Sequence, residues 1–218
     1  MRPAALRAVA DRVGVGSNTG RDAENPRRQE PDMPTTLLPE RAEAQAGPTQ
    51  LRIATTWDGA PCRPEEVVTL TLREENGLFV TIDAPFHGDP PPAPPPGSMW
   101  ELWEHEVVEL FVVGPNERYT ELELGPYGHD LLLRLEGRRN AVEKLIPVKA
   151  AVSRSGDRWT ATAHLPAHLL PPRPWRFNAF AVHGEAPNRR FLAWAPVPGS
   201  APDFHALEHF KSVPGFGD

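Results

Sequence analysis

The sequence has little cysteine, no excess of positive charge and no long apolar run. Its 218 residues contain one cysteine, Cys62, which excludes a disulfide framework, a thiolate metal site and a Cys-x-x-Cys redox pair. The 29 acidic residues outnumber the 23 basic ones, and no cluster of Lys and Arg offers the positive surface that nucleic acids or anionic membranes require. We therefore expect no nucleic-acid partner and no membrane partner. A single cysteine is compatible with a reducing compartment, and we predict a cytoplasmic location.

Helix-forming stretches are also scarce, because proline is abundant. The chain has 27 prolines among 218 residues, about 12%, against a usual content of roughly 5%. Proline removes a backbone hydrogen-bond donor and breaks the interior of a helix. An all-helical fold is therefore excluded, and short strands joined by turns are expected.

The first 50 residues contain no aromatic side chain and carry seven charges of each sign. Such a segment buries too little apolar surface to offset the entropy lost on ordering. Charged residues also interrupt its apolar stretches too often for a secretory signal peptide. We predict a disordered tail over residues 1 to 48, with Met33 as an alternative start, followed by one domain over residues 49 to 218.

Alternating and β-branched segments bounded by Gly, Pro, Asn and Asp begin at residue 51. They predict ten strands, at 51–56, 66–73, 78–84, 105–113, 118–125, 130–136, 142–153, 158–165, 175–183 and 190–195. Helical segments are expected only at 167–170 and 204–210. Ten short strands with no helices between them predict an all-β fold, an antiparallel β-sandwich or barrel rather than βαβ units.

The segment from residue 84 to residue 97 contains seven prolines, which makes it rigid and extended. It can be a strap across one end of a sandwich, or a proline-rich ligand for an aromatic groove on another protein. The second role requires a segment that is free in solution. Because strands flank this one on both sides, we favour the strap.

Carboxylates recur on two successive predicted strands. Side chains alternate along a strand, so Glu109 faces one side of the first strand, and Glu121 and Glu123 share one side of the next. If the two strands pair, Glu109 lies near Glu121 or Glu123. Paired carboxylates suggest a glycoside hydrolase, in which one acid protonates the leaving oxygen and the other attacks or activates water. The alternative is that these residues point to solvent or pair with Arg134 on the third strand.

Trp100 and Trp103 directly follow the proline segment and are interleaved with Glu101 and Glu104. Aromatic rings among carboxylates at a loop mouth are typical of a sugar site, where a ring stacks on the C–H face and carboxylates accept hydroxyl hydrogens. The same residues can instead form a hydrophobic plug at the edge of the sandwich. The two rings share a face only if this turn is helical.

The string His-Ala-Leu-Glu-His, residues 205–209, matches the His-x-x-Glu-His sequence of one class of zinc proteases. Catalytic zinc needs a third protein ligand, and Asp218 is the one acidic residue after His209. We therefore expect no metal. The sequence also has no nucleophile elbow and no phosphate-binding glycine loop, and we expect no cofactor.

Seven motifs follow one another along the chain: TTWDG (55–59), APFHGDPPPA (84–93), ELWEHEVVELF (101–111), YTELELGPYG (119–128), GRRN (137–140), FNAFAVHG (177–184) and PDFHALEHFKS (202–212). Together they resemble a family of small cytosolic proteins of animals and bacteria without an established activity. The resemblance spans residues 51 to 213.

A more distant resemblance is to the family 9 carbohydrate-binding modules, β-sandwiches of the DOMON-like group. It rests on the order of EVVELFV, YTELELGPYG, FNAFAVHG, AWAP and FHALEHF. The resemblance implies a jelly-roll-like β-sandwich that binds sugar or haem rather than catalysing a reaction. By position it implies that Glu109, Glu123 and Asn178 bind the ligand, and His183 stands where these modules often have arginine.

Our leading hypothesis is an antiparallel, jelly-roll-like β-sandwich that binds a carbohydrate or a similar small polar ligand without catalysis. The predicted ligand-binding residues are Trp100, Trp103, Glu109, Glu123, Arg134, Asn178 and His183. One alternative is a hydrolase of glycosides or related substrates that uses Glu109 and Glu123. The other is a protein-interaction module, which uses an open sheet edge and needs no pocket.

Overall fold

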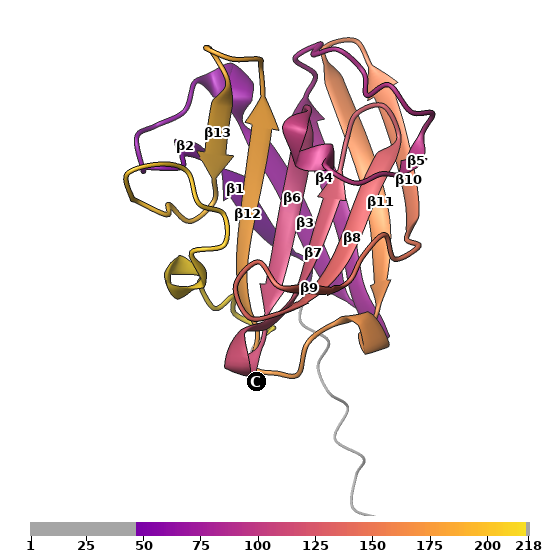
Figure 1. Cartoon of the computed structure of the whole chain (residues 1–218), viewed down its shortest axis with the longest axis vertical. Helices are drawn as coiled ribbons and strands as arrows, with labels where there is room; N and C mark the ends of the chain where they lie inside the picture. Colours follow the sequence, from indigo (N-terminus) through magenta and orange to yellow (C-terminus); the bar gives the residue numbers. More distant parts are fainter. Residues whose placement is uncertain (1–46, 217–218) are drawn as a thin grey trace, which may run out of the picture. The chain divides into compact units, whose positions relative to one another are not determined.

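Residues 47–216 form thirteen β-strands, which build two sheets that lie face to face (Figure 1). The computed structural model describes these residues, and the predicted tail at residues 1 to 48 falls outside them apart from Gly47 and Pro48. All helical segments of the described part are short 3-10 turns, so the predicted all-β fold is confirmed. No helix in this part of the chain is long and apolar enough to cross a membrane.

The first sheet has five antiparallel strands in the order β1-β3-β4-β11-β10. The strands are β1 (Thr49–Ile53), β3 (Val68–Glu74), β4 (Gly77–Pro85), β10 (Lys149–Ser155) and β11 (Arg158–Pro166). Buried and more exposed residues alternate along β11, where Trp159, Ala161, Ala163 and Leu165 are buried. This period of two is what a sheet requires when one face meets the core and the other meets water.

The second sheet has eight strands in the order β2-β13-β12-β6-β7-β8-β5, with β9 also paired to β8. The strands are β2 (Thr55–Thr56), β5 (Gly97–Ser98), β6 (Val107–Val113), β7 (Arg118–Leu124), β8 (His129–Glu136), β9 (Ala141–Glu143), β12 (Arg176–His183) and β13 (Arg190–Ala193). The pairing is antiparallel except between β5 and β8.

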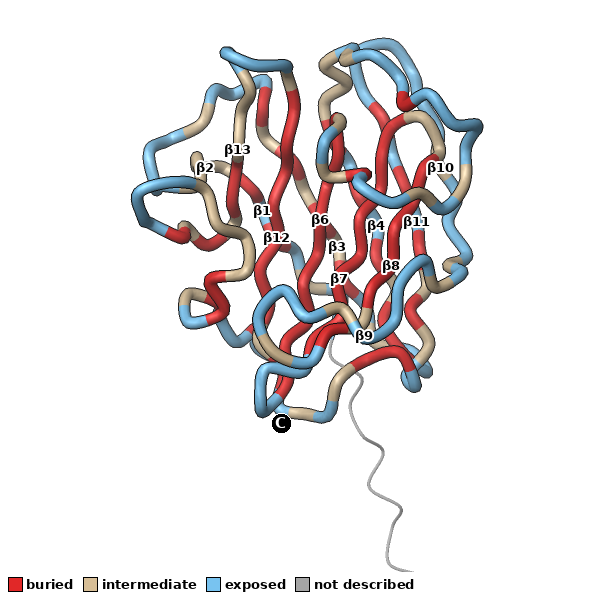
Figure 2. Tube along the Cα trace, viewed as in Figure 1, coloured by how far each residue is buried: buried red, intermediate tan, exposed pale blue. Residues whose placement is uncertain are grey.

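Strand β6 is buried along its whole length (Figure 2). Val108, Leu110 and Val112 belong to the core between the sheets, whereas Phe111 and Val113 belong to a second apolar cluster. A strand that is covered on both faces has an almost continuous apolar sequence, as VVELFVV does. The outer face of the eight-stranded sheet is therefore covered as well, by the 3-10 turns η2 (Leu102–Glu104) and η5 (Leu207–His209) and the chain around them.

A tight turn sets the register of β7 against β8. The turn from β7 to β8 closes with a hydrogen bond from Gly125 N to His129 O at 2.9 Å and needs a residue at φ 85°, which Gly128 supplies without strain. In the β6–β7 pair, Glu109 lies opposite Glu123, and Glu121 is the next residue on the same face. The predicted neighbourhood of these glutamates is thus confirmed.

All ten predicted strands have observed counterparts, but two of them are divided. The predicted strand 51–56 crosses from one sheet to the other at Ala54, so it becomes β1 and β2. The predicted strand 142–153 is interrupted around Pro147, which has no N–H for a sheet, and becomes β9 and β10. Strand β5 was not predicted, and the two predicted helical segments correspond to η4 (Ala167–Leu169) and η5.

The proline segment is attached to the eight-stranded sheet. The Glu106 carboxylate accepts hydrogen bonds from the backbone N–H groups of His87, Gly88 and Asp89 at 2.9 to 3.3 Å. The Asp89 carboxylate in turn accepts one from Gly184 N at 2.6 Å. The segment is therefore not free in solution, in agreement with the predicted strap.

An ion pair between a buried carboxylate and a partly exposed arginine joins the two sheets at one edge. Glu66 ends the 3-10 turn η1 (Pro64–Glu66), which leads into β3 of the first sheet, and its carboxylate is 1% exposed. Arg190 on β13 of the second sheet donates two hydrogen bonds to this carboxylate, from Nε at 2.8 Å and from Nη2 at 3.1 Å. Two parallel N–H···O bonds are the strongest geometry that such a pair can have.

Candidate functional site

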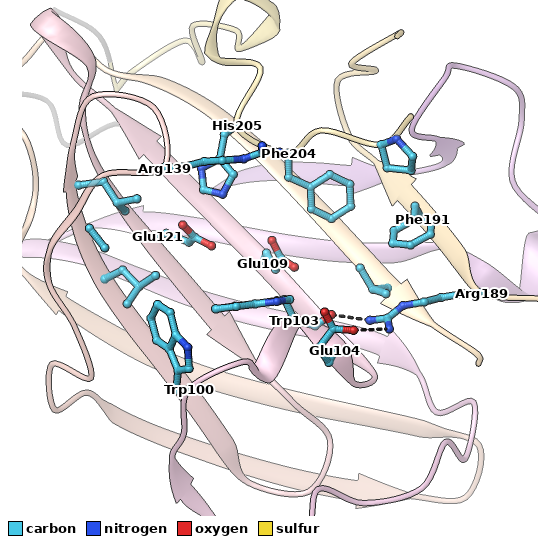
Figure 3. A pocket seen from close by; sticks show the side chains of 15 residues that line it. Trp100, Trp103, Glu104, Glu109, Glu121, Arg139, Arg189, Phe191, Phe204 and His205 are labelled. Atoms are coloured by element: carbon cyan, nitrogen blue, oxygen red, sulfur yellow. Dashed lines mark hydrogen bonds and ion pairs between the residues drawn. The ribbon is translucent and has the colours of Figure 1, made fainter. Parts of the chain in front are cut away.

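A cavity of about 610 Å³ lies on the outer face of the eight-stranded sheet. Its floor consists of Glu109 on β6, Glu121 on β7, Leu133 and Leu135 on β8, and Val182 on β12. Its walls come from segments that are far apart in the sequence: η2 and the residues before it, the β8–β9 connection, the β12–β13 connection with β13, and residues 202–205 (Figure 3). The segments that cover the outer face thus leave a cavity above Glu109 and Glu121.

The two floor glutamates are almost completely buried, with Glu109 2% and Glu121 3% exposed. Burial raises the pKa of Glu109 well above its usual range, and the nearby Glu121 carboxylate raises it further. Burial also raises the pKa of Glu121, to about 7. Burial and Glu121 therefore favour the protonated form of Glu109, while the Arg189 charge acts in the other direction, and Glu121 is balanced between its two forms near pH 7.

Glu123 extends this cluster beside the cavity and is fully buried. Neither of its carboxyl oxygens meets a donor group in the described part of the chain, and Glu121 lies on the same face of β7. Burial raises the pKa of Glu123 well above its usual range, and the Glu109 and Glu121 charges add to the effect. The three carboxyl groups thus form a proton-holding cluster on one sheet face.

Two tryptophans form one wall of the cavity. The 3-10 turn η2 is anchored by the buried Leu102, and it brings the rings of Trp100 and Trp103 into edge-to-face contact, with centroids 4.9 Å apart. Trp100 is 39% exposed at the rim, while Trp103 is half-buried. The two rings therefore meet, but not through the expected helical turn, because η2 begins only at Leu102 and Glu101 between the rings has a left-handed φ of 65°.

The opposite wall is the segment before η5. Phe204 stacks on Phe180 of the sheet at a centroid distance of 3.9 Å and meets the edge of Phe191. Asp203 accepts hydrogen bonds from the guanidinium groups of Arg138 and Arg139 in the β8–β9 connection. These contacts fix the segment over the sheet and leave two aromatic side chains, Phe191 and Phe204, facing the tryptophans across the glutamates (Figure 3).

His205 lines the cavity and is held in one orientation by Tyr119. The Tyr119 hydroxyl accepts a hydrogen bond from the Arg139 backbone N–H at 2.9 Å and lies 2.8 Å from His205 Nδ1. The hydroxyl hydrogen is therefore free to bond to Nδ1, which we assign as an acceptor, with the ring proton on Nε2. Burial lowers the pKa of His205 to about 4, and Arg139 and Arg138 add to the effect. His205 is thus neutral at pH 7.

Arg189 bridges the β12–β13 connection and the tryptophan wall. It donates one hydrogen bond from Nη1 to Glu104 at 3.1 Å and another to the backbone carbonyl of Trp103 (Figure 3). Its Nε is buried and has no partner within the described residues. Arg189 therefore positions the wall and keeps one N–H group available.

Comparisons with known proteins identify the family of this chain. No family model matches the sequence. The human UPF0462 protein C4orf33 is 42% identical over 170 residues, which cover 74% of this chain and 85% of the human protein. The chain belongs to the UPF0462 family. The zebrafish (Danio rerio) homologue is 37% identical over 165 residues, 72% of this chain and 84% of the fish protein. The predicted resemblance to a family of animal proteins is confirmed, and its extension to bacteria stays a prediction.

A solved structure shares the fold of this UPF0462 protein. It is a Bacteroides uniformis protein described as a "putative carbohydrate-binding protein", with a TM-score of 0.61 and 18% sequence identity, over 76% of this chain and 85% of that one. At this identity the likeness concerns the fold alone. It supports the predicted all-β sandwich.

The structure brings three of the predicted ligand-binding residues, Trp100, Trp103 and Glu109, to the cavity, and it places Glu123 directly beside it. Their role in binding stays a prediction.

The structure places Arg134, Asn178 and His183 away from the cavity. Arg134 points to the other side of β8 from Leu133 and Leu135 and pairs with Glu143. Asn178 is fully buried and exchanges hydrogen bonds with the backbone of Ala195 at 2.9 and 3.0 Å, which joins the chain after β13 to β12.

His183 lies at the end of β12, on the face turned away from the cavity. Its ring stacks on that of His87 at 3.5 Å, and its Nε2 is 3.3 Å from Glu66. Arg134, Asn178 and His183 thus do not line the cavity.

The described residues contain no group of three or more His, Cys, Asp or Glu side chains placed to hold a metal ion. His205 bonds to Tyr119 and lines the cavity. His209, the other histidine of the His-x-x-Glu-His string, does not line the cavity. The prediction that no metal binds there remains to be tested by metal analysis.

Among the charged and aromatic cavity residues, sequence reasoning did not assign five to a ligand site: Arg139, Arg189, Phe191, Phe204 and His205. Three of them lie inside quoted motifs, GRRN and PDFHALEHFKS, but nothing in their local pattern distinguishes a wall residue from a packing residue. Glu121 was considered as a neighbour of Glu109 but was not predicted as a ligand-binding residue. The alternation of side chains that placed Glu123 on this face of the strand places Glu121 there as well.

Proposed function

We propose that this protein binds a carbohydrate or a similar polyol in the cavity on the outer sheet face and does not change it chemically. The observation that carries the proposal is the combination of aromatic walls with buried carboxyl groups on the floor of one cavity. Aromatic rings can stack on the C–H faces of a sugar, while carboxyl groups bond to its hydroxyls. A volume of about 610 Å³ lies in the range of small-molecule sites, roughly 300 to 1,000 Å³.

Two further observations support the proposal. The fold is shared with a protein described as a "putative carbohydrate-binding protein", and the order of motifs resembles that of the family 9 carbohydrate-binding modules. The proposal includes a DOMON-like relationship. It also includes a cytoplasmic location, because a chain with a single, unpaired cysteine is compatible with a reducing compartment.

A thermal-shift screen of mono- and disaccharides tests the proposal, because a ligand that binds the native state stabilises it by about 2.7 kcal/mol at one hundred times its dissociation constant. We expect at least one sugar to raise the melting temperature of the full chain. Arg134→Gln, outside the cavity, should respond like the wild type, whereas Glu109→Gln should respond less. A response that is unchanged in Glu109→Gln would contradict a site in this cavity.

Replacing Trp103 by alanine should weaken binding of the sugar found in that screen by about 1 to 3 kcal/mol, the usual range for loss of an aromatic stacking surface. Stability should fall less than for a core tryptophan, because Trp103 is half-buried and its backbone carbonyl still accepts from Arg189. Titration calorimetry and urea unfolding measure the two effects. Trp100→Ala, at the exposed rim, should cost less affinity. Unchanged affinity in Trp103→Ala would exclude this ring as a binding surface.

A glycoside hydrolase is the second candidate, because Glu109 and Glu121 share the cavity floor. Glycosidases need one carboxyl protonated and the other ionised, so their sites move the two pKa values apart. Here burial raises the pKa of both. We therefore favour binding. Release of nitrophenol from nitrophenyl glycosides by the wild type but not by Glu109→Gln would decide for the hydrolase.

The interaction module without a pocket is not proposed. That alternative predicted no pocket, and the described residues contain this cavity.

A further inference from the structure

The basic side chains of the cavity walls have acidic partners, whereas the glutamates of the cavity floor have no basic ion-pair partner among the described residues. The guanidinium of Arg139 bonds to Asp203, and that of Arg189 bonds to Glu104 and to a backbone carbonyl. Both cations are thus paired at the rim. The floor glutamates form no ion pair with a basic side chain in the described part of the chain, and Glu121 Oε2 is buried without a hydrogen-bond partner.

We infer that the ligand of this cavity carries a protonated amine, and that it is an amino sugar or a related amino-polyol whose ammonium group binds between Glu109 and Glu121. This inference rests on the proposed function and specifies its ligand class. Both carboxyl groups point into the cavity between the aromatic walls (Figure 3).

A buried carboxylate without an ion-pair partner is costly, so burial shifts both floor glutamates toward their protonated forms, although the Arg189 charge opposes this shift at Glu109. An ammonium group supplies the missing charge and offers three N–H donors, which match the unpartnered oxygens. The rings of Trp103 and Phe204 favour a cation between them as well as a C–H surface. A divalent metal ion fits less well, because it requires more oxygen ligands than two glutamates, and the described residues contain no metal-holding group.

Binding of an ammonium group should release a proton. The groups around Glu121 are Glu109 on β6, Glu123 and Tyr119 on β7, Arg139 in the β8–β9 connection and His205 in the C-terminal segment. In the free protein the pKa of Glu121 is raised to about 7, and an ammonium partner lowers it. At pH 6 the carboxyl therefore loses its proton to the buffer as the amine binds. Affinity for the amine should rise from pH 5.5 toward 7.

Titration calorimetry of the full chain tests the inference with glucosamine, galactosamine and mannosamine, each compared with its parent hexose and its N-acetyl derivative. At pH 6.5 we expect at least one amino sugar to bind about tenfold more tightly than both neutral counterparts, the size of one charge-assisted hydrogen bond. Titrations in two buffers of different ionisation enthalpy should show proton release for the amino sugar alone.

Two variants complete the test. Glu121→Gln keeps the shape of the side chain and should lose the preference for the amine and the proton release, while Glu143→Gln, in an exposed ion pair, should keep both. Neutral sugars that bind as tightly as amino sugars would overturn this inference and leave the proposed function standing. Absence of binding by any sugar would overturn both. Equal binding of tetramethylammonium and the amino sugar would overturn the sugar part of the ligand class.

Discussion

Replacing Arg190 by alanine is expected to lower the free energy of unfolding by about 3 to 5 kcal/mol, because it leaves a buried carboxylate without its partner. Glu66 is 1% exposed and accepts two hydrogen bonds from Arg190 and one from the Arg63 backbone. Burial by itself would raise the pKa of Glu66, but these hydrogen bonds lower it to about 2. The carboxylate is therefore ionised near neutral pH, and truncation of Arg190 removes the ion pair between the two sheets and leaves the carboxylate with the Arg63 N–H and the His183 ring as neighbours.

Urea unfolding at pH 7 measures the effect. The matched control is Arg158→Ala, which breaks the exposed pair with Asp83 and should cost about 1 kcal/mol or less. Adding Glu66→Gln to Arg190→Ala should recover part of the stability, since it removes the isolated charge. If Arg190→Ala were no more destabilising than Arg158→Ala, the ion pair would not stabilise the contact between the sheets.

Lowering the pH from 7 to 4 is expected to remove roughly 3 kcal/mol of stability for each of two histidines, His183 and His205. Burial lowers the pKa of both to about 4, assisted by His87 near His183 and by Arg139 near His205. The unfolded chain takes up protons on these residues near pH 6.5, whereas the folded chain does so only near pH 4. Their contribution is therefore complete above pH 6.5 and is lost as the pH falls toward 4.

The cavity glutamates act in the opposite direction. Because the folded-state pKa values of Glu109, Glu121 and Glu123 are raised, their contribution is complete below about pH 4.5 and is lost as the pH rises through about 7. The two groups of residues partly cancel in the wild type, so the histidine effect must be measured in variants.

Urea unfolding of His183→Gln and His205→Gln at pH 7 and pH 4.5 separates these contributions. Each variant should lose about 2 to 3 kcal/mol less than the wild type between the two pH values, because it lacks one titrating ring. His168→Gln, at an exposed position, should follow the wild type. Parallel losses in all four proteins would show that these rings do not couple folding to pH.

Much of the fold followed from local pattern. Residues of alternating polarity between turn residues predicted every long strand, because side chains on a strand alternate between two faces whatever the surroundings. The same alternation placed Glu109, Glu121 and Glu123 on one sheet face. The alternation did not predict that the segment 51–56 passes from one sheet to the other. Such a crossing depends on which distant strand has a free edge to pair with.

The candidate site was also predicted only in part, because a local sequence pattern does not show which distant segments meet. The sequence by itself determined the neighbouring glutamates and the tryptophan pair before β6, because both depend on residues close together in the chain. Only the tertiary structure decided that the segments of Arg189, Phe191 and His205 close over those glutamates, and that Arg134 and His183 lie elsewhere. Which loops meet is set by packing between residues far apart in sequence. The burial that raises the pKa values of the glutamates and leaves them without an ion-pair partner arises from the same packing and has no local signal.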